Sequence, residues 1–301
     1  MDAAGIGSPS SRPLRIVIFP WLAFGHMHPY LELAERLASR GHRVSFVSTP
    51  RNIARLPAAP RVDMVALPLP RVDGLPDGAE STNSVPAEKF ILPIQAFDGL
   101  AAPFKEFLDA ACADEETRPD WIIVDSFHHW TAAAAVERKV PCAMLQPAAA
   151  ALASWTSQSS VPRYERKQTA RANTNHGAHG LSLGERFSLT REKCTLLAMR
   201  SCVEWEGEAF TLAASILSKP LGKKVGLQVP RDENDGSFDR HGVASTVRAV
   251  MLQEEERRAF VANARKAQEV VADKELQERY VDEFVQHLRS YATTYGNFHT
   301  S

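Results

Sequence analysis

The sequence predicts an α/β fold built on a parallel sheet, and two features of its first 220 residues indicate this. Short apolar runs of strand length alternate with stretches whose apolar residues recur at helical spacing. Clusters of glycine and proline separate the two kinds of segment. Strands that alternate with helices along a chain form a parallel sheet with right-handed connections. No such alternation follows residue 220, so a second doubly wound domain is not expected.

The first strand is predicted at residues 16–19, and a loop with Gly25 and His26 follows it. A helix comes next, because Pro29 suits a first helical turn and the apolar residues after it have helical spacing. His26 is therefore expected at the carboxyl end of a strand, just before a helix N-terminus. Open α/β sheets place their chemistry at this edge.

The remaining elements follow from the same patterns. Further strands are predicted at residues 44–48, 62–67, 120–125, 140–145 and 194–199. Helices are predicted to start near 49–52 and to cover 90–113 (divided by Pro93 and Pro103), 130–138, 148–157, 205–217 and much of 243–291. Residues 71–86 are expected to form a surface loop, the polar stretch 158–185 a mobile loop, and residues 1–13 a disordered N-terminus.

Composition excludes several classes of protein. The chain has 35 Lys and Arg against 36 Asp and Glu, so no global charge favours nucleic acid or a membrane surface. Charged residues and prolines interrupt the most apolar stretch, residues 132–153, so no stable membrane insertion is expected. The 4 cysteines lie far apart without C-x-x-C pairs, which is typical of reduced thiols in a cytosolic protein. A cytoplasmic location is predicted.

His26 is the first candidate for chemistry. The positive end of the helix is expected to disfavour its imidazolium form, which leaves a neutral ring able to accept a proton near pH 7. Asp125 ends a neighbouring strand at the same edge and could hold the histidine tautomer. Two plainer interpretations remain open: His26 as a loop histidine bonded to backbone, and Asp125 as the N-cap of the next helix.

Other chemistries fit the sequence less well. His26 and His28 resemble the metal-binding pair of barrel hydrolases, with His128 and His129 as possible partners, but that site needs further ligands at later strands. The loop after the first strand has Gly25 alone, which does not make a dinucleotide site. No G-x-S-x-G motif indicates a serine hydrolase.

Aromatic residues near strand ends predict an apolar pocket beside His26. They are Phe24, Phe127, Trp130 and Trp155. For each of them, ordinary core packing is the competing interpretation.

Several motifs of the first half resemble the plant family-1 UDP-glycosyltransferases, and in particular the branch that adds sugars to flavonoid or terpenoid glycosides. These motifs are Phe19-Pro20-Trp21 through Gly25-His26-x-x-Pro29, Gly41-His42-Arg43-Val44, Ser48-Thr49-Pro50-Arg51-Asn52, and Pro119-Asp120-Trp121 with Val124-Asp125. The resemblance covers residues 14–155 well and 190–220 loosely. It resumes at residues 222–225 and 231–238.

The resemblance implies the GT-B fold of two facing Rossmann-like domains. Residues 14–220 would be the acceptor-binding domain, and residues 221–301 a truncated, helix-rich remnant of the donor domain. It implies that His26 is the base and that Asp125 supports it, while a hexose moves from a UDP-sugar to an acceptor hydroxyl with inversion. No metal or cofactor is implied, and the chain would be a monomer. The expected acceptor-binding residues are Phe24, Gly25, Phe127, His128, Trp130 and Trp155.

The sequence departs from this family in one large respect. The donor signature of the family, with its W-x-P-Q start, H-x-G-W-N-S centre and closing D/E-Q, is absent from the sequence. The missing segment would lie between Pro220 and Gly222. An alternative function is therefore a non-catalytic form that binds an acceptor or a partner protein.

Overall fold

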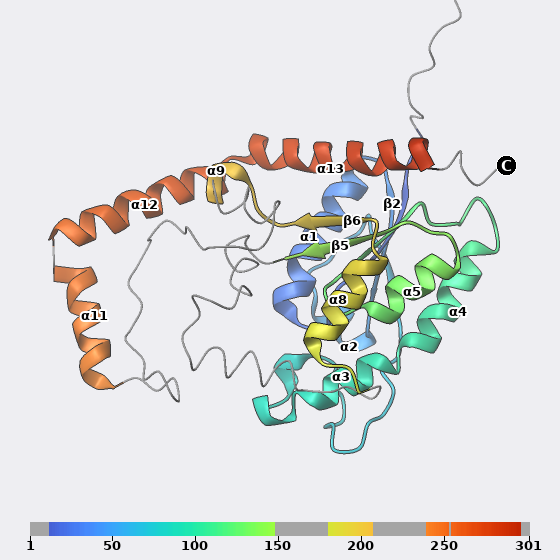
Figure 1. Ribbon diagram of the computed structural model, residues 1–301, viewed down its shortest axis with the longest axis horizontal. Coiled ribbons are helices and arrows are strands. Elements are labelled where there is room, and N and C mark those ends of the chain that lie inside the picture. The colour runs from blue at the N-terminus through green and yellow to red at the C-terminus, as the bar shows by residue number, and fades with distance from the viewer. Residues whose placement is uncertain (1–11, 148–179, 207–238, 253, 296–301) are drawn as a thin grey trace, which may run out of the picture. The chain divides into compact units, whose positions relative to one another are not determined.

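The computed structural model describes residues 12–147, 180–206, 239–252 and 254–295 (Figure 1). These residues group into two compact units. The first unit contains residues 12–147, 180–198 and 279–295, and the second contains residues 199–206 and 239–278. The expected division, which assigned every residue after 220 to a second domain, stays a prediction.

The first unit is built on a six-stranded sheet with the order β3-β2-β1-β4-β5-β6. Its strands are β1 (Arg15–Phe19), β2 (Arg43–Ser48), β3 (Asp63–Ala66), β4 (Trp121–Val124), β5 (Cys142–Gln146) and β6 (Leu196–Met199). The pairs from β3 through β5 are parallel, and this order places β1 and β4 side by side. The α/β fold with a Rossmann-like parallel sheet is confirmed, and all six strands lie within a residue or two of their predicted positions.

The first helix starts earlier than predicted. α1 covers Phe24–Ser39, so Gly25, His26 and Pro29 lie inside it and not in a loop. Ala23 has an extended backbone and accepts the first helical bonds from the amides of His26 and Met27. Because Pro29 lacks an N–H, it removes one backbone donor from the helix without ending it.

The stretch 90–113 is also divided differently. α3 (Ile91–Asp98) and α4 (Ala101–Cys112) are separated at Gly99 and Leu100, whereas Pro93 and Pro103 lie in the first turns of the two helices. A proline is tolerated there because first-turn N–H groups have no partner within the helix. The predicted break at the prolines was therefore wrong.

Three further helices and two short 3-10 turns belong to the first unit. They are α2 (Pro50–Arg55), α5 (His129–Glu137) and α8 (Leu183–Lys193), with short 3-10 turns at Thr82–Ser84 and Ala87–Lys89. α8 occupies the last residues of the predicted mobile loop, because Ser182 and Glu185 form a reciprocal capping box. The predicted helix at 148–157, the rest of that loop, Trp155 and the junction near Pro220 lie outside the described residues.

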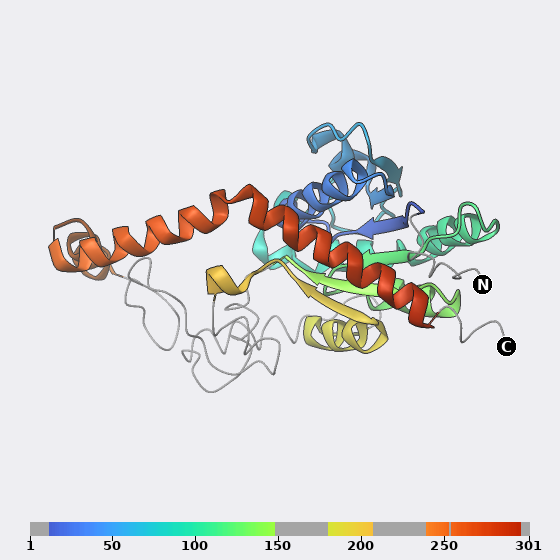
Figure 2. The ribbon, with the colours of Figure 1, turned by 90° about the horizontal axis from the view of Figure 1, so that it is seen from above.

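Alternate residues of each strand enter two apolar layers. Ile16 and Ile18 face α1 and α13 (Lys274–Tyr295), whereas Val17 and Phe19 face α3, α4 and α5. Figure 2 shows residues 279–295 of α13 lying across the sheet on the side of α1. Leu288 of α13 is fully buried, and its carbonyl accepts the indole N–H of Trp121 at 3.0 Å. Burial of one face of α13 explains why residues 279–295 belong with the sheet.

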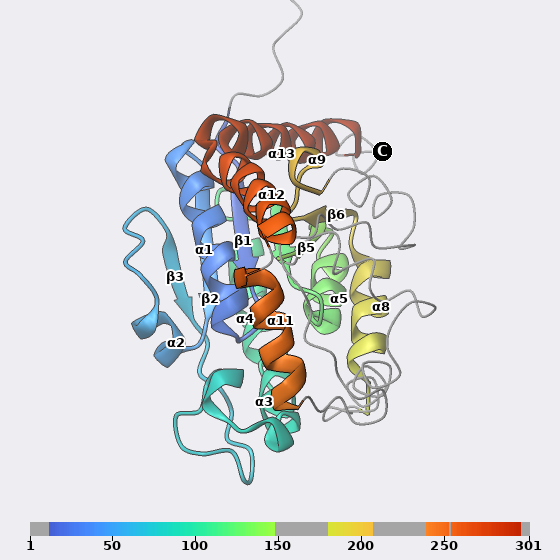
Figure 3. The ribbon, with the colours of Figure 1, turned by 90° about the vertical axis from the view of Figure 1, so that its left-hand side faces the viewer.

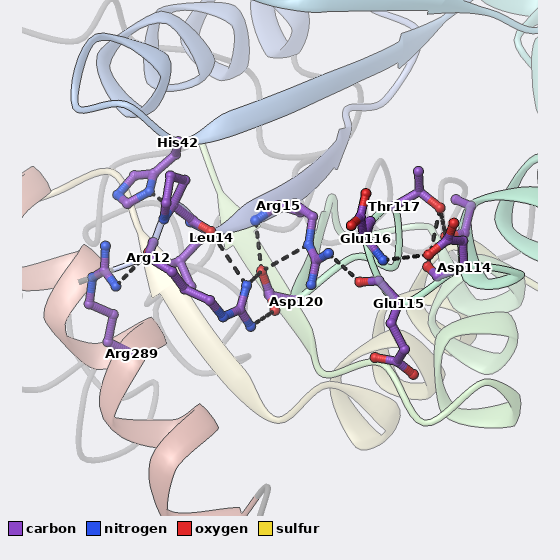
Figure 4. Close-up of polar contacts among 12 residues, drawn as sticks. Arg12, Leu14, Arg15, His42, Asp114, Glu115, Glu116, Thr117, Asp120 and Arg289 are labelled. Atoms are coloured by element: carbon purple, nitrogen blue, oxygen red, sulfur yellow. Dashed lines mark hydrogen bonds and ion pairs between the residues drawn. The ribbon is translucent and has the colours of Figure 1, made fainter. Parts of the chain in front are cut away.

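Polar contacts fix the start of the chain to the amino end of the sheet (Figure 4). Asp120 accepts the guanidinium of Arg12 at 3.0 Å and the backbone N–H of Arg15 at 2.8 Å. Arg289 of α13 donates to the carbonyl of Arg12 at 3.0 Å. Residues 12 and 13 are therefore held in place, contrary to the predicted disorder of residues 1–13, of which 1–11 are not described.

The described part of the second unit is helical. It comprises α9 (Val203–Glu206), α11 (Arg240–Leu252), α12 (Glu254–Ala272) and the first turn of α13 (Figure 3). Within the described residues, these helices agree with the predicted helix-rich character of 243–291. No helix among the described residues is long and apolar enough to cross a membrane.

Candidate active site

A hydrogen-bonded pair of side chains lies at the carboxyl edge of the sheet. β1 and β4 are neighbours, and each is followed by one member of the pair. His26 lies in the first turn of α1, and Asp125 directly follows β4. Nδ1 of His26 and Oδ2 of Asp125 are 2.7 Å apart. The strand positions made this contact possible, and the structure brings the two residues together.

Backbone groups hold the Asp125 carboxylate in place. Asp125 is fully buried, with Oδ2 accepting the N–H of Trp21 at 3.2 Å and Oδ1 accepting the N–H of Ser126 at 2.6 Å. The N-cap of α5 is His128, with no side-chain capping bond, so Asp125 does not serve as that cap. Its side chain instead contacts the backbone N–H groups of Trp21 and Ser126 and the ring of His26.

The two groups shift each other's pKa. Burial alone would raise the pKa of Asp125, but the hydrogen bond and positive charge of His26 outweigh it and lower the pKa below its usual value. Burial alone would lower the pKa of His26, but the hydrogen bond and charge of Asp125 outweigh it and raise the pKa. The expectation that the helix end would disfavour the imidazolium is therefore wrong, because a carboxylate in contact acts more strongly than a helix terminus.

The pair leaves one ring nitrogen of His26 available. With Nδ1–H donating to Asp125, the neutral ring carries its lone pair on Nε2. The side chain of His26 is 32% exposed, so the ring is half-buried and still accessible. A neutral imidazole held in one tautomer by a buried carboxylate can accept a proton at Nε2.

Two of the predicted acceptor-binding residues lie in the same turn of α1 as His26. A Cβ added at Gly25 would meet no atom within 4 Å, so the backbone there borders open space. The Phe24 ring is half-buried, with the guanidinium of Arg55 4.3 Å from its centroid and the His28 ring 5.8 Å away. Phe24 and Gly25 thus directly precede His26 in the first turn of α1.

Two other predicted residues lie in the core. Trp130 is 8% exposed and packs against Phe97 with ring centroids 4.9 Å apart. His128 is fully buried between Phe97 and Phe19, at 4.7 and 4.9 Å, and burial lowers its pKa to about 3. The structure therefore places both side chains in the core, which for Trp130 is the interpretation that competed with pocket lining.

The last two predictions have different outcomes. Phe127 is partly buried, with its ring 5.5 Å from that of Trp21, and its role stays a prediction. Trp155 lies outside the described residues.

A hollow of about 300 Å³ lies within the loop from Leu69 to Glu80, and its lining includes neither His26 nor Asp125. Within the described ranges, no cluster of three or more His, Cys, Asp or Glu residues could hold a metal ion.

Sequence reasoning missed the residues that support the pair. Tyr30 lies one helical turn after His26, and its single hydroxyl hydrogen is shared between the backbone carbonyls of Leu145, at 2.5 Å, and Val124, at 3.2 Å. Gln146 at the end of β5 donates to the hydroxyl of Ser126 at 2.9 Å. The spacing of four between His26 and Tyr30 was the available signal, because residues four apart share one helix face.

Comparison with known proteins finds similar chains among plant glycosyltransferases. UDP-glycosyltransferase 91C1 of Arabidopsis thaliana is 34% identical over 257 residues, which cover 75% of this chain and 54% of that protein. The soyasaponin III rhamnosyltransferase of Glycine max is 36% identical over 149 residues, which cover 48% of this chain and 30% of that protein. No family profile matches the chain.

Solved structures agree on the fold. The crystal structure of Arabidopsis thaliana UGT89C1 complexed with quercetin superimposes with a TM-score of 0.55 at 22% identity, over 69% of this chain and 48% of that one. The matched region amounts to about half the length of the Arabidopsis 91C1 protein.

Proposed function

Because the chain belongs to the plant UDP-glycosyltransferases, we propose that its sheet unit is the acceptor half of such an enzyme and that His26 is the catalytic base. The observation that carries the proposal is the 2.7 Å contact between Nδ1 of His26 and the buried carboxylate of Asp125. It holds the tautomer in which Nε2 is the free proton acceptor.

The proposed reaction transfers a hexose from a UDP-sugar to a hydroxyl of a small secondary metabolite. Nε2 of His26 takes the hydroxyl proton while the hydroxyl oxygen attacks the anomeric carbon of the sugar. UDP leaves from the opposite face, so the configuration at that carbon inverts. Asp125 stabilises the imidazolium that forms, and a hydrogen bond to a charged group contributes about 1.5–3 kcal/mol. The UDP-sugar is the donor substrate, and the proposal requires no metal or cofactor.

The proposed acceptor is a flavonoid or terpenoid glycoside. The names of two similar proteins support the terpenoid and flavonoid character of this class, since one is a soyasaponin III rhamnosyltransferase and the other was solved with the flavonoid quercetin. Phe24 and the open backbone at Gly25 are the residues proposed to meet the acceptor beside His26. We also propose that the chain acts as a cytoplasmic monomer without nucleic-acid partners.

A second candidate is a non-catalytic form that binds an acceptor or a partner protein. The observation that favours it is the absence of the family's donor signature from the sequence. Transfer needs groups that stabilise the charge developing on the leaving diphosphate, and that signature normally supplies them.

One set of measurements separates the two candidates. The full chain is incubated with UDP-glucose or UDP-rhamnose and a panel of flavonoid and terpenoid glycosides, and products are detected by mass spectrometry. The first candidate predicts a product that disappears in His26→Ala and persists in His287→Ala, a matched control at an exposed histidine of α13. Acceptor binding by calorimetry, with neither UDP-sugar binding nor product, would establish the second candidate.

A further inference from the structure

Two cysteines from distant parts of the sequence meet at the start of β5. Cys142 is the first residue of β5, and Cys194 follows the last residue of α8, 52 positions later. Their Sγ atoms are 3.4 Å apart. The N–H of Thr195 donates to the carbonyl of Cys142 at 2.8 Å, so the two backbones are also hydrogen-bonded neighbours.

We propose that Cys142 and Cys194 are a redox modification site that closes to an intramolecular disulfide when the protein meets hydrogen peroxide. A disulfide is about 2.0 Å long, so the sulfurs must approach by about 1.4 Å from their 3.4 Å separation. Small rotations of the two side chains provide a movement of this size. The hydrogen bond from the N–H of Thr195 to the carbonyl of Cys142 already keeps the two cysteines side by side.

The two thiols differ in access, which assigns their roles. Cys194 is partly exposed and Cys142 is buried. The thiolate of Cys194 attacks one peroxide oxygen, the O–O bond breaks, and the departing hydroxide leaves as water after taking a proton. The resulting sulfenic acid is then attacked by the thiolate of Cys142, so that the S–S bond forms and the S–O bond breaks. The second oxygen also leaves as water, and the peroxide has accepted the two electrons that the thiols lost.

The environment of Cys142 sets the pH dependence of closure. The hydrogen bond with Cys194 and burial both raise the pKa of the Cys142 thiol well above its usual value. Because only the thiolate attacks, the second step is slow near neutral pH and accelerates as the solution becomes alkaline.

Closure would join elements that support the candidate active site. β5 runs from Cys142 to Gln146, which donates to Ser126 beside Asp125. α8 packs against α5, the helix that follows Asp125 (Figure 3). A bridge would fix β5 to the end of α8 and would reduce the freedom of the unfolded chain, which is expected to raise the melting temperature by at least about 5 °C.

The double variant Cys112→Ser/Cys202→Ser of the full chain keeps only the proposed pair. After treatment with hydrogen peroxide, its free thiols should fall from two to zero with a mass loss of two hydrogens, and digestion should yield a peptide linking Cys142 to Cys194. Dithiothreitol should restore both thiols. The rate should be higher at about pH 9 than at about pH 7.

Two further samples keep the test decisive. In the unmodified protein, which has four free cysteines, peptide mapping should find the same link even if the double variant folds poorly. Cys194→Ser should yield no intramolecular link. A sulfinic acid on Cys194 without a link, a disulfide between two chains, or two unreacted thiols would each overturn the proposal.

Discussion

Asp125→Asn tests the central feature of the site, because it replaces the carboxylate with a side chain of the same shape. The carboxylate accepts three contacts: Trp21 N–H and His26 Nδ1 at Oδ2, and Ser126 N–H at Oδ1. An amide has one oxygen and one NH₂ group, so at least one of these donors meets another donor. Breaking a buried, charge-assisted bond in this way is expected to destabilise the protein by about 2–3 kcal/mol.

The same substitution should change the chemistry of His26. If the amide NH₂ faces the ring, His26 must accept at Nδ1 and carry its proton on Nε2, where it can no longer act as a base. If the amide oxygen faces the ring, the tautomer is kept but the charge that stabilises the imidazolium is lost. Either arrangement should lower the pKa of His26 and reduce transfer by about 10²- to 10⁴-fold.

Two assays are needed, since one must not depend on turnover. Nitrogen-15 NMR of the His26 ring, recorded across pH, reports both its tautomer and its pKa, and initial rates report transfer. Asp109→Asn is the matched control, because that carboxylate lies on the surface, where it pairs with Arg138, and ion pairs of this kind contribute little. An unchanged or higher pKa of His26 in Asp125→Asn would refute the assigned role of the carboxylate.

Three further predictions concern stability. The guanidinium of Arg186 is 1% exposed and donates to the Asp98 carboxylate at 2.5 and 2.6 Å. Asp98→Ala leaves this buried charge unpaired and should lower the free energy of unfolding, measured in urea, by about 3–5 kcal/mol. Ser182→Ala removes the capping box of α8 and should cost about 1 kcal/mol in the same assay; an unchanged midpoint would contradict the capping role. The lowered pKa of Asp125 contributes stability that is present above the ordinary carboxyl pKa of about 3.9 and is lost as the pH falls through the pKa of Asp125 in the folded protein. In an acid titration, Asp125→Asn should therefore lose less stability than the unmodified protein.

The main features of the sheet and the candidate catalytic pair could be predicted because they depend on order along the chain. Parallel strands end at one edge, so the segments that follow β1 and β4 lie near each other once those strands are neighbours. This reasoning singled out His26 and Asp125 as a possible pair, and the family resemblance implied their roles as base and supporting carboxylate. The helix-rich end of the chain was likewise predicted from its charged, periodic pattern.

Other features depend on packing that no local pattern records. The start of α1 at Phe24 follows from the extended backbone of Ala23, whereas Pro29 suggested a later start. Trp130 lies close to Asp125 in sequence, but the rotation of α5 about its axis directs the indole against Phe97 in the core. The attachment of residues 279–295 to the sheet depends on Leu288 and Trp121, which are 167 positions apart.

The pH dependence of transfer follows from which of two influences on His26 is stronger. A helix N-terminus typically destabilises a nearby cation by about 0.3–1 kcal/mol, whereas a hydrogen bond to a buried carboxylate favours it by about 1.5–3 kcal/mol. The carboxylate prevails, and the pKa of His26 is raised above its ordinary 6.5. The stability that this pair contributes through His26 is therefore fully present below about pH 6.5 and is lost as the pH rises through the folded pKa.

Catalysis requires the opposite protonation state, since only the neutral ring accepts a proton. The rate should therefore increase with pH through the raised pKa of His26, and the midpoint of this increase should lie above 6.5. In Asp125→Asn the residual rate should increase at a lower pH, because the group that raises the pKa has lost its charge. A rate that falls as the pH rises through this range would mean that the imidazolium, and not the neutral ring, is the active form. His26 would then act as an acid, in conflict with the proposed removal of a proton from the acceptor.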